Sequence, residues 1–126
     1  MREKVAFYRC EVCGNLVELI NRGGGEMVCC DQPMTRLVAN TVDASAEKHV
    51  PYVTRKDGKI YVQVGSEPHP MIPEHYIQWI VMVTDKTMVR VALSPNDEPK
   101  AVFDDLGDAD VYEYCNLHGL WKAEVK

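Results

Sequence analysis

Four of the chain's five cysteines fall in its first thirty residues, where Cys10 and Cys13 form a C-x-x-C pair and Cys29 and Cys30 are neighbours. Adjacent cysteines are poorly suited to a disulfide, because the bond needs a Cα separation and a dihedral angle that neighbours reach only with strain. An odd total also leaves at least one thiol unpaired in any disulfide framework. The pattern therefore predicts four thiolate ligands that hold one metal ion in a tetrahedral site.

The segment around these cysteines needs the metal ion to fold. Short strands are expected at 4–9 and 16–20, and a glycine-rich turn at 21–25 leads back toward the cysteine pair. A piece this small has few large apolar residues to bury, so metal binding must supply folding free energy. On spacing alone a structural zinc ion is favoured over a single iron ion, and both remain open at this point.

The remaining cysteine and all four histidines form a second set of candidate ligands. Each lies at the end of an expected strand or in a loop, where rigid scaffolds commonly hold binding sites. The set is His49, His69, His75, Cys115 and His118. A single histidine is more often a structural residue than a ligand, so the prediction depends on all five acting together. Zinc prefers four ligands, whereas iron accepts four nitrogens and one sulfur with a sixth position open for chemistry.

The two predicted sites differ in charge. Four neutral imidazoles and one thiolate around Fe(II) leave a net charge of about +1, whereas four thiolates around Fe(II) or Fe(III) give about −2 or −1. The chain as a whole carries a formal charge of −5. A small anionic substrate would therefore be attracted only to the second site and its local positive charge.

The rest of the chain is expected to form a β-sandwich. Apolar alternation is lost over residues 40–47, which indicates a connector, and the domain boundary is placed near Leu37. Residues 50–55 and 59–64 flank Asp57-Gly58, a hairpin signal because the turn needs positive φ at both central positions. Further strands are expected at 76–84, 87–93, 101–103, 111–114 and 120–125. The whole chain should be mainly β, with a small metal-knuckle domain followed by a sandwich of about seven strands.

Composition excludes two classes of partner. The net charge of −5 argues against a broad nucleic-acid surface, which would present a basic face to phosphates. No apolar run approaches the roughly 20 residues that span a bilayer, and no apolar stretch of a secretory signal follows the charged N-terminus. Unpaired cysteines fit a reducing compartment. We therefore expect a cytoplasmic protein that binds neither nucleic acid nor membranes.

The motifs together resemble a known family. Cys10, Cys13, Cys29 and Cys30 are similar to the rubredoxin-like iron site of desulforedoxin. Four further motifs resemble the superoxide reductase centre: Glu-Lys-His-Val-Pro at 47–51, His-Pro-Met at 69–71, Glu-His-Tyr-Ile-Gln-Trp-Ile at 74–80 and Cys-Asn-Leu-His-Gly-Leu-Trp at 115–121. In order, and over nearly the whole chain, they resemble desulfoferrodoxins, the two-iron superoxide reductases.

This resemblance implies two iron ions per chain. One would be held by the four cysteines of a desulforedoxin-like domain over 1–37. The other would lie in an immunoglobulin-like domain over 38–126, with four equatorial histidines and an axial Cys115. The resemblance also implies a homodimer that reduces superoxide to hydrogen peroxide by one electron. A small reduced carrier such as rubredoxin would supply that electron.

Two charged residues beside the first histidine acquire a role through the same resemblance. Glu47 would occupy the sixth iron position in the oxidised resting state, and Lys48 would lie beside the open face. Elementary electrostatics agrees for Lys48, since an ammonium group next to a positive metal site focuses a small anion there. Without the resemblance, both would be interpreted as solvated surface charges.

Three alternatives follow from the residues. A pure electron carrier would explain the four-cysteine site, but it would normally close its coordination, and the second set offers only five strong ligands. A zinc-stabilised interaction module would be colourless, whereas ferric thiolate sites absorb visible light. A superoxide dismutase is the nearest activity, and it differs in needing no external electron donor.

Overall fold

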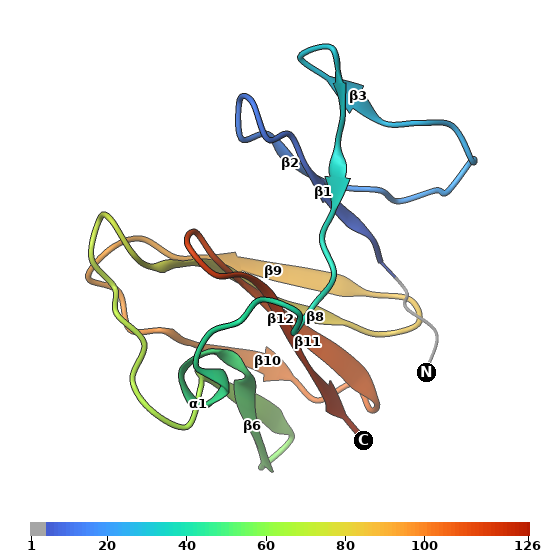
Figure 1. Cartoon of the computed structure of the whole chain (residues 1–126). Helices are drawn as coiled ribbons and strands as arrows, with labels where there is room; N and C mark the ends of the chain where they lie inside the picture. The colour runs from blue at the N-terminus through green and yellow to red at the C-terminus, as the bar shows by residue number, and fades with distance from the viewer. Residues whose placement is uncertain (1–4) are drawn as a thin grey trace. The chain divides into compact units, whose positions relative to one another are not determined.

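The computed structural model describes residues 5–126 and divides the chain into two compact units, Met1–Val38 and Ala39–Lys126 (Figure 1). Short β-strands make up nearly all the regular structure of the described residues, which include one helical turn. The expected mainly β fold is confirmed. None of the helical structure within 5–126 is long and apolar enough to cross a membrane.

The first unit consists of two small antiparallel sheets around the cysteine segment. Its strands are β1 (Phe7–Arg9), β2 (Leu16–Glu18), β3 (Val28–Cys29), β4 (Gln32–Pro33) and β5 (Thr35–Arg36). Strand β1 lies between β2 and β5, while β3 and β4 form a separate two-stranded ladder. The strands expected at 4–9 and 16–20 are present in shortened form, and Lys4 lies outside the described residues. Strands of three residues or fewer give such a unit little stability of their own, because isolated short hairpins are marginal in water.

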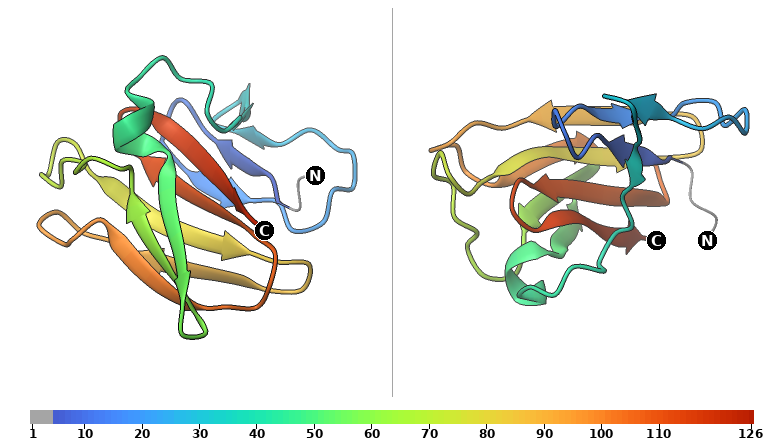
Figure 2. Two further views of the ribbon diagram at one scale, coloured as in Figure 1. Left: turned by 90° about the horizontal axis from the view of Figure 1, so that it is seen from below. Right: turned by 45° about the horizontal axis from the view of Figure 1, so that its top comes forward.

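The second unit is a two-layer sandwich (Figure 2). Its elements are α1 (Ala46–His49), β6 (Pro51–Lys56), β7 (Lys59–Val64), β8 (Ile77–Val83), β9 (Met88–Ala92), β10 (Lys100–Asp104), β11 (Ala109–Cys115) and β12 (Gly119–Val125). One sheet has the order β10-β7-β6 and the other the order β12-β11-β8-β9. The seven strands and their division into three and four match the immunoglobulin-like sandwich that we expected.

The hairpin predicted at Asp57-Gly58 is present, and the strands expected at 76–84 and 87–93 pair as another hairpin. Strands β6 and β7 pair from Pro51 with Val64 to Lys56 with Lys59, and the turn residues Asp57 and Gly58 have φ of 54° and 76°. Positive φ at both positions matches the right-handed twist of the flanking strands, which is why the Asp-Gly signal is reliable. Strands β8 and β9 pair in the same way around the second turn. The first hairpin leads directly into the segment that carries His69.

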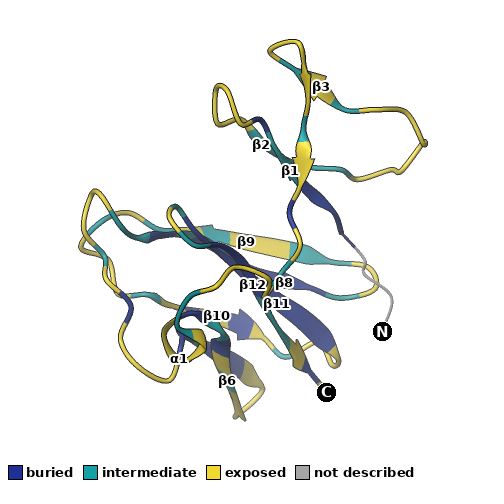
Figure 3. Ribbon diagram, viewed as in Figure 1, coloured by how far each residue is buried: buried dark blue, intermediate teal, exposed yellow. Residues whose placement is uncertain are grey.

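The interior is filled by apolar side chains from both sheets, and β8 and β11 are buried along their length (Figure 3). Alternation in the sequence predicts that Ile77, Trp79, Val81 and Val83 share the core face of β8. All four are buried, but the core cluster takes Ile77 together with Ile80 and Met82. The reason is an irregularity in the ladder: Trp79 pairs with Tyr114 while Ile77 pairs with Cys115, so one extra residue of β8 is accommodated there. Such a bulge re-aims side chains beside it, here at a candidate ligand.

The helical turn found in the described residues begins inside the segment 40–47, which the sequence predicts as a connector, and continues to His49. Residues 46–49 form α1, closed by a bond from the Val50 N–H to the Ala46 carbonyl of 2.9 Å. A single turn has no hydrophobic periodicity to detect, so sequence reasoning missed it. Its last residue is His49, which α1 carries into the buried interior.

Candidate metal centres

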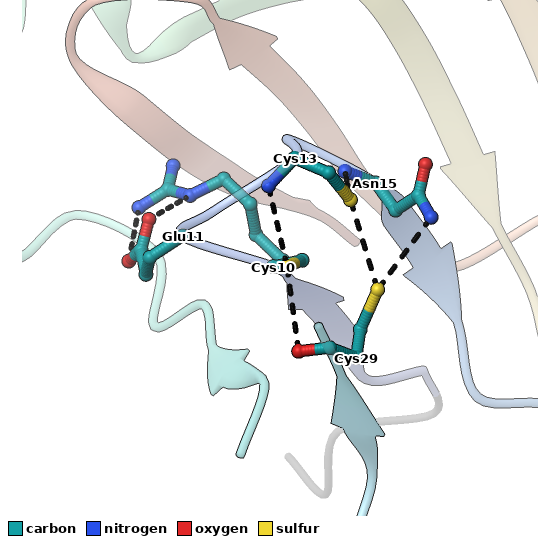
Figure 4. Close-up of polar contacts among 6 residues, drawn as sticks. Cys10, Glu11, Cys13, Asn15 and Cys29 are labelled. Atoms are coloured by element: carbon teal, nitrogen blue, oxygen red, sulfur yellow. Dashed lines mark hydrogen bonds and ion pairs between the residues drawn. The ribbon is translucent and has the colours of Figure 1, made fainter. Parts of the chain in front are cut away.

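The four cysteines of the first unit are brought together by two different turns. Their Sγ atoms all lie within 4.8 Å of one another, and all four are free thiols. The Cys13 and Cys29 sulfurs point toward one another at 3.6 Å (Figure 4), and the Cys29 and Cys30 sulfurs are 3.9 Å apart. Four sulfurs bound tetrahedrally at about 2.3 Å would lie about 3.8 Å apart. The spacing therefore fits a tetrahedral metal–thiolate centre.

The cysteine pair depends on a hairpin turn between β3 and β4. Cys29 pairs with Gln32, and the two residues between them, Cys30 and Asp31, have φ of 52° and 60°. Left-handed backbone at both positions folds the chain back within two residues. This turn explains how adjacent cysteines can act at one site, because it directs the second sulfur back toward the first.

Hydrogen-bond donors from the backbone and from one side chain point at the sulfurs of the same centre, where they favour the ionised thiolates. The Cys13 N–H donates to the Cys10 sulfur, the Asn15 N–H to the Cys13 sulfur, and the Asn15 side-chain amide to the Cys29 sulfur. The N–H of Cys13 is the main reason why the pKa of Cys10 falls to about 6. The neighbouring thiols of Cys13 and Cys10 raise the pKa of Cys30 to about 12. Four crowded sulfurs do not ionise together without a cation, so the donor set calls for a metal ion.

In the second unit the four histidines form a closed ring of neighbours. Ring centroids are 4.7 Å apart for His49 and His69, 4.7 Å for His69 and His75, 5.0 Å for His75 and His118, and 4.9 Å for His118 and His49. Every neighbouring pair is close to perpendicular, with interplanar angles of 77° to 84°. The ligand atoms of His49, His69, His75 and Cys115 lie within 4.8 Å of one another, and His118 Nδ1 is 3.9 Å from the Cys115 sulfur. The structure therefore brings all five predicted ligands together.

The tautomers of two histidines test whether a metal ion fits. His49 Nδ1 lies 2.7 Å from the Ser45 carbonyl oxygen, and His69 Nδ1 lies 2.7 Å from that of Pro70. A carbonyl only accepts, so each Nδ1 carries the proton and donates. Burial lowers the pKa of His49 and brings that of His69 to about 4, so both rings are neutral with bare Nε2 atoms.

These bare nitrogens face one another. His49 Nε2 is 3.1 Å from His69 Nε2 and 3.2 Å from His118 Nδ1. Among the described residues, the buried Nε2 of His75 has no hydrogen-bond partner. Lone pairs held this close without protons between them repel unless a cation lies at their centre. The arrangement therefore fits a resident metal ion, with three Nε2 atoms and one Nδ1 atom as its nitrogen donors.

Cys115 supplies the fifth donor from the end of β11, beside the bulge. Its side chain is fully buried, and its sulfur accepts a bond of 3.4 Å from the His118 N–H. Burial raises the pKa of the thiol, backbone N–H groups of His118 and Leu117 oppose that rise, and the Glu113 carboxyl adds to it. A bound cation would reverse this balance, because a coordinating thiol is deprotonated outright.

Glu47 and Lys48 lie in α1 directly before His49, and both are exposed. The pKa of Glu47 is lowered first by a bond to its own backbone N–H and by Ser45, with a smaller effect of Lys48. Burial is the main cause of the lowered pKa of His49, and the Lys48 charge is a minor one. These effects place the ammonium within electrostatic reach of the histidine ring.

Sequence reasoning missed two residues that hold the ligands. Trp121 stacks on the His49 ring with centroids 4.8 Å apart, and its indole N–H donates to the His118 carbonyl at 3.0 Å. Asn116 accepts from the Tyr76 N–H at 2.9 Å and donates through its side chain to the Glu74 carbonyl at 3.0 Å. Both follow a ligand closely in the Cys-Asn-Leu-His-Gly-Leu-Trp motif, which was the one available signal.

Asn116 should be needed to retain the metal ion at the second centre. Its two side-chain bonds hold the residues on either side of His75, so Asn116→Ala should weaken retention of the metal against a chelator about tenfold, a typical loss when a residue that orients a ligand is removed. The matched control is Asn40→Ala, which also removes two side-chain bonds, both to the backbone of Lys122. Equal metal retention in the two variants would show that Asn116 contributes only general stability.

Desulfoferrodoxin family profiles and curated desulfoferrodoxins match this chain over nearly its whole length. The profile of the desulfoferrodoxin N-terminal domain matches residues 2–37, and that of desulfoferrodoxin matches residues 41–124. The desulfoferrodoxin of Syntrophotalea carbinolica is 50% identical over 125 residues, covering 98% of this chain and 99% of the relative. That of Nitratidesulfovibrio vulgaris is 44% identical over 126 residues, covering 99% and 100%.

A solved structure agrees with this result. The superoxide reductase from Treponema pallidum superposes with a TM-score of 0.75 at 34% identity, covering 97% of this chain and 99% of that one. The four-cysteine cluster and the histidine–cysteine cluster correspond to the two iron sites of desulfoferrodoxins. This chain belongs to the desulfoferrodoxin family.

Proposed function

We propose that this chain is a superoxide reductase, which uses one electron and two protons to convert each superoxide into hydrogen peroxide. The convergence of four imidazole nitrogens and one thiolate on one point carries the proposal. Five donors would leave a bound iron ion able to take one more small ligand, whereas a centre that only transfers electrons normally fills its positions. Similar solved structures from Treponema pallidum and Giardia intestinalis are superoxide reductases, which supports the same activity.

Ferrous iron in this site would supply the electron and a Lewis-acidic position for a small anion. The chain's own residues do the rest. The exposed Lys48 attracts superoxide electrostatically and orients a water molecule that donates a proton to the product. Cys115 would hold the iron as the one anionic donor of the five, and its thiolate would raise the electron density that the iron offers to the substrate. Glu47 would be the residue available to bind the oxidised iron at rest.

We assign the sites and the domains accordingly. Cys10, Cys13, Cys29 and Cys30 bind the first iron within a domain over 1–37, and His49, His69, His75, Cys115 and His118 bind the second within a domain over 38–126. The working protein is a cytoplasmic homodimer. A small carrier of the rubredoxin kind reduces it, because the reaction consumes an electron that the substrate does not provide.

Electron stoichiometry tests the activity and separates it from dismutation. The anaerobically reduced protein is mixed with superoxide in the presence of a limiting reduced donor, and donor oxidation and peroxide are both measured. Reduction predicts about one donor electron and one peroxide per superoxide. Consumption of superoxide with no donor oxidised, and one peroxide formed for every two superoxides, would identify a dismutase.

Replacing Lys48 with alanine should slow superoxide capture. Loss of a positive charge beside a small-anion site should lower the second-order rate constant roughly tenfold and flatten its dependence on ionic strength. Both metals should remain bound, since the ammonium donates to no ligand in the described structure. Lys86→Ala, in the exposed β8–β9 turn, removes the same charge and serves as the control. A Lys48→Ala rate equal to that of the control would remove Lys48 from the mechanism.

A further inference from the structure

Gly65, directly after β7, packs against the backbone of the Glu47–Lys48 segment. A Cβ atom on this residue would lie 2.5 Å from the Glu47 carbonyl oxygen, 2.6 Å from the Lys48 carbonyl carbon and 2.7 Å from the Lys48 Cα. All three atoms belong to the main chain, so no side-chain rotation relieves the overlap. Its φ of 73° also favours glycine. Only glycine lets the two backbones approach this closely.

Hydrogen bonds join the same two segments. The Glu67 N–H donates to the Glu47 carbonyl at 2.9 Å, and the Ser66 hydroxyl reaches the same oxygen at 3.4 Å. The Gly65 N–H donates to the Val50 carbonyl at 3.1 Å. Residues 65–67, here called the glycine turn, thus bond to the backbone of α1 at Glu47 and directly after α1 at Val50.

The glycine turn lies between elements that carry Lys48 and two of the candidate histidine ligands. It runs from the rigid β6–β7 hairpin to His69, and it grips the backbone that carries Lys48 and His49. The Lys48 backbone N–H donates to the Ser45 carbonyl at 3.3 Å, but its ammonium has no ion pair or hydrogen bond within the described part of the chain. Its ammonium is therefore positioned by its backbone, and the backbone is positioned by the glycine turn.

We propose that Gly65 is a positioning residue for superoxide capture: its close contact with the Glu47–Lys48 backbone sets where the Lys48 ammonium stands relative to the four histidines. This inference rests on the proposed function for its kinetic consequence. Its structural part, the contact between the glycine turn and α1, stands independently.

The hairpin offers a matched control for the obvious variant. Gly58, in the β6–β7 turn, has φ of 76°, nearly that of Gly65, but no atom lies within 4 Å of its added Cβ. Gly65→Ala and Gly58→Ala therefore share the backbone strain, and they differ in the collision with α1. Gly65→Ala should lower the rate constant for superoxide capture about tenfold and flatten its ionic-strength dependence, while Gly58→Ala keeps both.

A double-mutant cycle distinguishes positioning from general damage. If Gly65 acts through Lys48, the Gly65→Ala/Lys48→Ala protein should be no more than about twofold slower than either single variant, because one interaction is lost only once. Fully multiplicative losses, or a Gly65→Ala rate equal to that of Gly58→Ala, would overturn the proposal.

Amide hydrogen exchange of the iron-loaded protein tests the contact without using activity. The Glu67 amide should be protected in the original protein and in Gly58→Ala, and exposed in Gly65→Ala. If superoxide reduction itself is absent, this readout still decides whether the glycine turn holds α1. Should Gly65→Ala fail to retain iron, Ser66→Ala takes its place, since it removes one donor to the Glu47 carbonyl without a collision. In that case, a Ser66→Ala rate constant for superoxide capture equal to that of the original protein, together with an unprotected Glu67 amide in the original protein, would contradict the proposal.

Discussion

Replacing Cys115 with serine should abolish superoxide reduction, with a fall of at least about a hundredfold in rate. The thiolate is the one anionic donor among the five, and a serine hydroxyl stays protonated where a thiol would ionise. The visible absorption of the histidine–cysteine centre should vanish with the sulfur–iron bond. Stopped-flow superoxide consumption and the absorption spectrum measure both effects.

The first centre provides the internal control for this variant. Cys115 is fully buried, so serine also buries a polar hydroxyl in the core, at a cost of about 1–3 kcal/mol. The four cysteines lie in the other compact unit of the chain, which should keep its own absorption band. Cys115→Ala, which adds no polar group, should show the same kinetic loss. A serine variant that keeps both its spectrum and its rate would remove Cys115 from the iron site.

Replacing Cys13 with serine should have the complementary effect. The first centre should lose its iron and its colour, and residues 5–38 should lose protection from proteolysis. Strands of at most three residues cannot supply the roughly 10–16 kcal/mol that a structural metal contributes in comparable small domains. The second unit has its own core and should keep its thermal transition.

The rate of superoxide reduction by the Cys13→Ser protein shows whether turnover needs the first centre. With an artificial donor, the Cys13→Ser protein should reduce superoxide at close to the original rate, because all five ligands of the second centre lie in the other unit. Val12→Ala, an exposed position inside the same C-x-x-C loop, is the control that should retain both irons. Loss of superoxide reduction in Cys13→Ser with an artificial donor would show that the first iron is obligatory for turnover.

The clustering of the candidate ligands could be predicted because their chemistry is local in the sequence. Cysteine and histidine are rare, and every one of them in this chain lies in one of the two clusters. The Asp57-Gly58 hairpin was equally accessible, since its turn type requires residues that tolerate positive φ. The residues themselves left zinc and iron open, and similarity to known proteins decided between them.

The parts that sequence reasoning missed are those defined by contacts across the fold. Asn116 binds backbone more than forty residues away, and Trp121 stacks on a ring from α1. The helical turn of α1 is too short for periodicity and is held by its bonds to the glycine turn. The four residues predicted for the core face of β8 are all buried, but one extra residue near Cys115 leaves Trp79, Val81 and Val83 outside the core cluster that contains Ile77. None of these features leaves a periodic or compositional trace.

X-ray absorption at the iron edge of the Cys13→Ser protein tests the central claim most directly, because that variant retains iron only at the second centre. Four imidazole nitrogens and one thiolate predict a first shell of four or five light atoms and a single sulfur. The ferrous protein should show one position that exchanges with an added small anion. A shell with several sulfurs, with no sulfur, or already complete and inert to added anions would contradict the account.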